Sequence, residues 1–92
     1  MAENSKPDIN SLLFAQLVIG FQAEVWQHLG KVANILTGRI EKNLELAKNA
    51  IDTLSMLEVK TQGNLSENEL IFLRQILSRL RLDYAEAEKN SD

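Results

Sequence analysis

Apolar residues recur at helical spacing in three stretches of the chain, separated by two glycine-containing links. One helical turn takes about 3.6 residues, so an apolar residue every third or fourth position marks a buried helix face. The expected fold class is therefore all-α, a three-helix, hairpin-type bundle. The pattern places the helices at about residues 9–29, 43–62 and 67–88.

The first helix has clear start and stop signals. Asp8 and Asn10 are both candidate N-caps, because a short side-chain oxygen can accept from the free N–H groups of the first turn. With Asn10 as the cap, Ile9 and Phe14 would form a hydrophobic staple. Gly30 follows the helix where a left-handed residue commonly ends one.

The second helix carries an ordinary apolar stripe and stops before Gly63. The stripe consists of Leu44, Ala47, Ile51 and Leu54, and it is widened by Leu46, Ala50 and Leu57.

The third helix begins at the capping box Ser66-Glu67-Asn68-Glu69, with Leu65 and Leu70 at the staple positions. A coiled-coil-like seam with 3-4-3-4-3 spacing follows. It consists of Leu70, Leu73, Leu77, Leu80, Tyr84 and Ala87, with Phe72 and Ile76 as a second apolar edge.

The first helix differs from the other two because apolar residues surround nearly its whole circumference. Only a narrow strip with 4-3-4 spacing is polar or small: Gln16, Gly20, Ala23 and Gln27. A helix that is apolar all round is normally buried all round, and two partner helices cover only about two of its sides.

This excess of apolar surface predicts a homo-oligomer, most simply a dimer, since two-fold dimers are the commonest oligomers. The expected interface consists of Leu13, Phe14, Leu17, Val18, Phe21 and Trp26. The alternative is a monomer whose connector folds over the first helix. Gly20 either marks a close crossing between helices or lies on an exposed strip where the stability cost of a helical glycine is tolerated.

The connector at residues 31–42 contains a Thr37-Gly38 turn flanked by Ile35, Leu36 and Ile40. These apolar residues predict that the connector packs down onto the bundle, as a short hairpin or as a helical turn.

Composition narrows the class of protein. Ninety-two residues make one domain, expected at 9–89 with disordered tails at 1–8 and 90–92. The chain has no cysteine, which excludes disulfides, thiolate-bound zinc and a thiol nucleophile. The net charge of −3 disfavours a general electrostatic grip on nucleic acid or anionic lipid.

The apolar run at residues 12–21 lacks the basic flank and cleavage site of a signal peptide. It is also interrupted by polar residues within any membrane-spanning window of about 20 residues. We therefore expect a cytoplasmic protein, with membrane association not favoured.

Candidate chemistry is sparse. His28 with Glu24 is one carboxylate–histidine pair, and we expect His28 to bond the last helix carbonyls instead. Asp52 lies mid-helix, where Lys48 is its expected partner.

Three carboxylate pairs lie near helix ends, at 41/45, 67/69 and 86/88. Three arginines concentrate on the third helix and are expected to lie over the core or pair with acidic residues: Arg74, Arg79 and Arg81.

A family resemblance rests on several short runs between residues 11 and 86. These are His28-Leu29-Gly30, Asn43-Leu44-Glu45-Leu46-Ala47, Ile51-Asp52, Met56-Leu57, Lys60-Thr61, Gly63-Asn64-Leu65, Leu80-Arg81 and Tyr84. They resemble a small bacterial family catalogued as a domain of unknown function, number 1844 in that series. In that family the connector often carries a proline and acidic residues, whereas residues 31–42 have no proline. The resemblance implies an all-helical, cytoplasmic bacterial protein and no reaction, cofactor or catalytic residue.

The function expected is a homo-oligomeric interaction or scaffold module without catalytic activity, cofactor or metal, and a further protein partner stays open. The alternative is a peripheral membrane or lipid-associated protein that uses the first helix. A small enzyme built on His28, Glu24 or Asp52, and a nucleic-acid binder, are less favoured.

Overall fold

A computed structural model describes residues 8–90 of the chain. The predicted tails lie almost wholly outside these residues. Two of their members are described, however, because Asp8 caps the start of α1 and Asn90 caps the end of α3.

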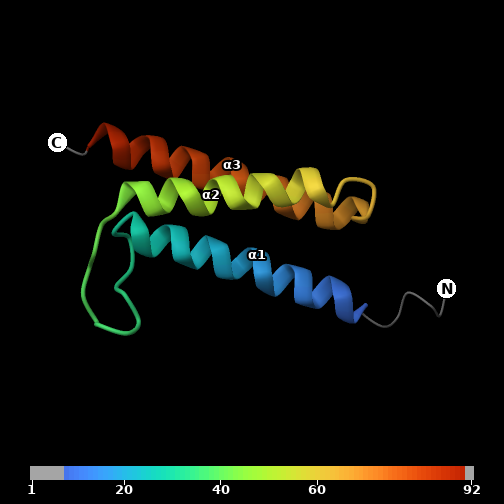
Figure 1. Cartoon of the computed structure of the whole chain (residues 1–92), viewed down its shortest axis with the longest axis horizontal. Helices are drawn as coiled ribbons and strands as arrows, with labels where there is room; N and C mark the ends of the chain where they lie inside the picture. The colour runs from blue at the N-terminus through green and yellow to red at the C-terminus, as the bar shows by residue number, and fades with distance from the viewer. Residues whose placement is uncertain (1–7, 91–92) are drawn as a thin grey trace.

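Three helices form an antiparallel bundle (Figure 1). They are α1 (Ile9–His28), α2 (Leu44–Lys60) and α3 (Glu67–Lys89). Within residues 8–90 the only extended pairing is one isolated bridge between Leu29 and Lys42. The all-α three-helix prediction is thus confirmed, with helix ends within two residues of those expected.

Local signals account for the helix ends. The Asp8 side chain accepts from the backbone N–H of Asn10, so Asp8 rather than Asn10 is the N-cap of α1. Asn43 caps α2 through its side-chain oxygen, which accepts from Leu46 N. Gly30 follows α1 with a φ of +80°, a left-handed conformation that a residue with a Cβ adopts at a cost.

The capping box at the start of α3 forms as expected. The Ser66 hydroxyl accepts from Glu69 N at 3.1 Å, and Glu69 Oε1 accepts from Ser66 N at 2.8 Å. Two free N–H groups of the first turn are thereby satisfied.

The core lies where the three apolar faces meet. Its buried apolar residues are Val18, Val25, Leu29, Ala47, Ala50, Ile51, Leu54, Leu73, Ile76, Leu77 and Leu80. The predicted stripes of α2 and α3 are therefore the core faces. Two predicted stripe residues are exceptions. Leu46 points outward and is about half exposed. Leu70 is only partly buried and lies outside the core cluster.

The connector between α1 and α2 was expected to pack down, and this prediction is wrong. Its base is hairpin-like, with Asn43 N donating to His28 O at 2.7 Å. Its tip is a turn built on Asn34, whose side chain accepts from Leu36 N at 2.7 Å. This turn holds Ile35 and Leu36 in solvent, where they are 91% and 93% exposed.

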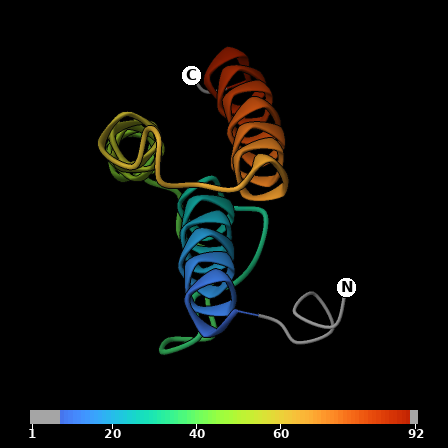
Figure 2. The ribbon, with the colours of Figure 1, turned by 90° about the vertical axis from the view of Figure 1, so that its right-hand side faces the viewer.

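The connector also leaves α1 uncovered. In both views it extends past α1 on the side away from α2 and α3 (Figure 1, Figure 2). The alternative of a monomer whose connector folds over α1 therefore does not describe this structure.

Candidate interaction surface

The inner side of α1 faces the core of its own chain. Val18 and Val25 have no exposed surface. Phe14, Phe21 and Trp26 are partly buried and pack against the same core. One side of this helix thus needs no partner copy.

The six predicted interface residues therefore divide by position. Val18 is a core residue, so it is unavailable to a partner and leaves the candidate set. Phe14, Phe21 and Trp26 lie at the margins with part of each side chain exposed. Leu13 and Leu17 lie on the outer side, 54% and 48% exposed.

The outer side of α1 is an apolar surface in water. We define the α1 outer face by its exposed large side chains: Ile9, Leu12, Leu13, Leu17 and Ile19. At 100° per residue these flank the strip of Gln16, Gly20 and Ala23, which is also exposed. Ile9, Leu12 and Ile19 were not among the predicted interface residues, although Leu12 and Ile19 belong to the apolar residues that surround nearly the whole helix.

Gly20 lies at the middle of this face and touches nothing across it. A Cβ built at Gly20 would have no atom within 4 Å outside its own helix. Packing within the chain therefore does not require glycine here, and an interior helical glycine costs about 1 kcal/mol relative to alanine.

Trp26 is anchored by a buried acid that the sequence pattern did not single out. Its indole Nε1 donates to Asp83 Oδ2 at 3.1 Å, which ties α1 to α3. Asp83 is only 5% exposed, and its Oδ1 lies 3.6 Å from Arg79 Nε. The sequence does contain a signal for this buried acid, because Asp83 interrupts the apolar stripe of Ile76, Leu80 and Ala87.

His28 pairs with a neighbouring carboxylate. Its Nε2 lies 3.5 Å from Glu24 Oε2, so the ring faces the previous turn rather than the last carbonyls as expected. Residues 8–90 contain no group of three or more histidine, aspartate or glutamate side chains placed to hold a metal ion. The partly buried His28 and the exposed Glu24 therefore form a pair without a further ligand from the described part of the chain.

Asp52 has the exposed position and the partner expected from its spacing. Lys48 Nζ donates to Asp52 Oδ2 at 2.9 Å, and both side chains are more than half exposed. The hydrogen bond and the charge of Asp52 raise the pKa of Lys48 above its usual range. The pair is a solvated contact on the helix surface.

Glu69 links the start of α3 to α1. Its Oε2 accepts a hydrogen bond from the Ser11 hydroxyl, while Oε1 belongs to the capping box. Hydrogen bonds from Ser11 and then from the Ser66 backbone hold the pKa of the Glu69 carboxyl below its usual range. This carboxylate is therefore a structural group.

The three arginines of α3 each contact their own chain. Arg74 Nε donates to Glu58 Oε2 at 2.8 Å, and Arg81 Nη2 donates to Ser55 Oγ at 3.0 Å. Arg79 lies against Asp83, as described above. The expected pairing with acidic residues is thus found for Arg74 and Arg79.

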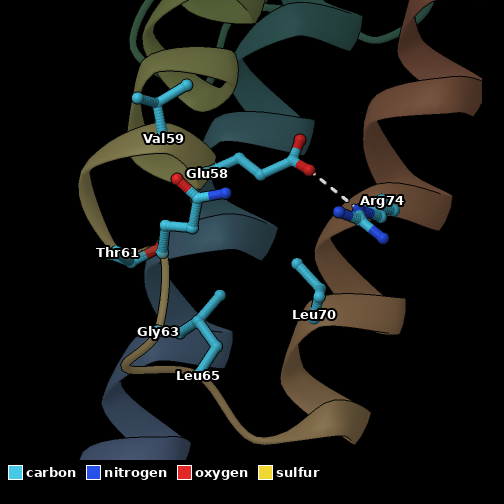
Figure 3. Close-up of a pocket in the computed structure, with 8 residues that line it drawn as sticks. Glu58, Val59, Thr61, Gly63, Leu65, Leu70 and Arg74 are labelled. Atoms are coloured by element: carbon cyan, nitrogen blue, oxygen red, sulfur yellow. Dashed lines mark hydrogen bonds and ion pairs between the residues drawn. The ribbon is translucent and has the colours of Figure 1, made fainter.

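The Arg74–Glu58 pair lies beside a pocket at the turn between α2 and α3 (Figure 3). The pocket has a volume of about 170 Å³. Its other walls include Val59, Leu65 and Leu70, and its lining has neither a histidine nor a serine. The one carboxylate of the lining is paired with arginine, and the Thr61 hydroxyl donates to the backbone oxygen of Leu57.

Within residues 8–90, α1 is the helix long and apolar enough to cross a membrane by length and composition. A buried core helix and a signal sequence meet the same two criteria. Little of α1 is buried, since 11% of its most apolar window lies inside the bundle.

These features define the class: a small all-α protein whose helices form an antiparallel bundle with one apolar helix face open to solvent. The chain belongs to the family described as a domain of unknown function, DUF1844, whose model matches residues 11–86. The resemblance read from the sequence is thereby confirmed. No curated protein and no solved structure matches the chain.

Proposed function

We propose that the protein is a homo-oligomeric interaction or scaffold module without catalytic activity, and that its simplest assembly is a dimer formed through the α1 outer face. The observation that carries the proposal is the exposure of five large apolar side chains on the two sides of the strip of Gln16, Gly20 and Ala23 on one helix. Large apolar side chains gathered on one exposed face mark an interaction site in soluble proteins.

The proposal also accounts for Gly20. Helices that cross closely need small residues at the contact, and no atom of the described residues outside α1 lies within 4 Å of a Cβ built at Gly20. A second α1 laid along the strip of Gln16, Gly20 and Ala23 would cover the exposed leucines that flank it.

A paired substitution tests the α1 outer face. The variant Leu13→Glu/Leu17→Glu places two carboxylates per chain on that face, and we expect dimer affinity to fall at least about 100-fold. Leu82→Glu is the matched control, since Leu82 is 65% exposed on α3. Sedimentation of wild type and both variants gives the readout, and equal affinities for all three would contradict the proposal.

A second candidate function is peripheral association with a lipid surface through α1. The length and apolar character of α1 favour it. The absence of lysine and arginine between Ile9 and Leu29 counts against an anionic surface. Liposome flotation separates the two candidates: binding that Leu13→Glu/Leu17→Glu abolishes supports the lipid function, and no flotation removes it.

A further inference from the structure

We infer that the two copies pair antiparallel through α1, and that the connector of each copy clasps the start of the partner's α1. This arrangement rests on the proposed dimer and specifies its partner contacts. The juxtaposition that carries it is the connector, which projects past α1 on the side away from α2 and α3 (Figure 1, Figure 2). The exposed side chains of the α1 outer face lie on the helix side that α2 and α3 do not cover.

The connector tip has the apolar character of an interface segment, and among residues 8–90 it has no partner that covers it. Ile35 and Leu36 are more than 90% exposed, and Val32 and Ile40 are exposed as well. The tip is nevertheless ordered by hydrogen bonds. Asn34 N donates to Arg39 O at 2.8 Å, and Gly38 N donates to Asn34 O at 2.7 Å. A turn that holds two large apolar side chains in water is preorganised for a contact outside the chain.

The area needed by a stable dimer favours a contribution from the connector. A typical specific interface buries about 800 Å² on each partner. A helix of 20 residues is about 30 Å long and about 10 Å wide, so its footprint is on the order of 300 Å². The α1 outer face alone falls short of a typical interface, and the connector supplies the adjoining apolar surface.

Charge favours the antiparallel order over the parallel one. Residues 31–42 hold three cations and Glu41, a net charge of +2, so the rest of the −3 chain carries −5. Parallel pairing would bring the two cationic connectors together. Antiparallel pairing keeps the two connectors apart. It brings each to the bundle end where Asp8, Glu67 and Glu69 begin α1 and α3, and where Lys60 as the last residue of α2 leaves acidic residues in excess.

The crossing point sets the register. With Gly20 at the two-fold axis, each position on α1 opposes the position equally far beyond Gly20 on the partner. Leu13 then faces Gln27 of the other copy, and Ile9 faces the base of the connector near Lys31. Because the connector projects from this base past α1, its tip lies beside the first turn of the other copy's α1.

Cysteine cross-linking tests this register cleanly, because the chain has no native cysteine. Equimolar Leu36→Cys and Ile9→Cys proteins, joined by a short bismaleimide, should give a covalent mixed dimer as the main product. Leu36→Cys with Leu82→Cys is the matched control and should stay at background. Leu13→Cys alone should also stay at background, because a dimer of that variant would require the parallel order.

The outcomes separate this inference from the proposed function. A wild-type chain that sediments only as a monomer would overturn both. A wild-type dimer with background cross-linking between positions 36 and 9, or with efficient Leu13→Cys dimers, would overturn the clasp alone. As an independent measure, Ile35→Ser/Leu36→Ser should weaken dimerisation about tenfold or more. Unchanged affinity in that variant would also overturn the clasp.

Discussion

At the scale of single residues, the polar groups that matter are those that join helices. Trp26 and Asp83 form such a link, and so do Ser11 and Glu69. By contrast, the Lys48–Asp52 pair lies within one helix in solvent, where such pairs contribute only a few tenths of a kcal/mol. Burial and partner therefore decide which acidic residue has a structural role, and the number of acidic residues in the sequence does not.

Removing the Asp83 acceptor should destabilise the protein. Asp83→Ala leaves the Trp26 indole N–H without its partner, and we expect a loss of about 1–3 kcal/mol in the free energy of unfolding. Asp83→Asn keeps an acceptor oxygen and should lose less. Urea denaturation followed by Trp26 fluorescence gives these values. Asp52→Ala is the control, expected within about 0.5 kcal/mol of wild type. A loss in Asp83→Ala no larger than in this control would refute the role given to Asp83.

The Glu69 carboxylate should make stability depend on pH in the acid range. Its pKa in the folded state lies below the ordinary value of 4.5, so it contributes stability above that pH. This contribution is lost as the pH falls through the folded-state pKa. The difference in unfolding free energy between wild type and Glu69→Gln should therefore be constant above about pH 6 and shrink below pH 4.5. Ser11→Ala removes the largest cause of the shift and should flatten the same profile, whereas a profile unchanged in both variants would show that Glu69 is not held as described.

At the scale of elements, the sequence predicted helix ends well because local chemistry determines them. The capping box at Ser66, the cap at Asn43 and the stop at Gly30 each act within one turn of the chain. The connector could not be predicted in the same way. Its apolar residues imply burial, but a single sequence does not say which surface buries them, and the turn at Asn34 aims them away from their own bundle.

The capping box should be worth about as much as a typical N-cap. Ser66→Ala removes the side-chain acceptor for Glu69 N, and we expect a loss of about 1 kcal/mol in unfolding free energy. Ser78→Ala is the matched control, because Ser78 is exposed in the interior of α3 and alanine favours helix. Thermal or urea unfolding distinguishes the two, and an equal effect of both substitutions would contradict a stabilising cap at Ser66.

At the scale of the whole molecule, one small bundle holds more apolar surface than it covers. The circular apolar pattern of the first helix predicted this excess, and the structure divides it into an inner core side and the α1 outer face. The same pattern does not tell which single residues lie on the inner side and which on the outer side. Val18 and Leu17 are neighbours of equal hydrophobic character, yet the first is buried and the second is half exposed. The two side chains leave α1 in different directions, and only Val18 points toward α2 and α3.

Sedimentation velocity of the untagged wild-type chain at micromolar concentration tests the central claim most directly. The chain mass is 10.4 kDa, and we expect a species of twice that mass. In Leu13→Glu/Leu17→Glu the equilibrium between dimer and monomer should shift toward the monomer. A single 10.4 kDa species across the micromolar range, unchanged by those substitutions, would contradict it.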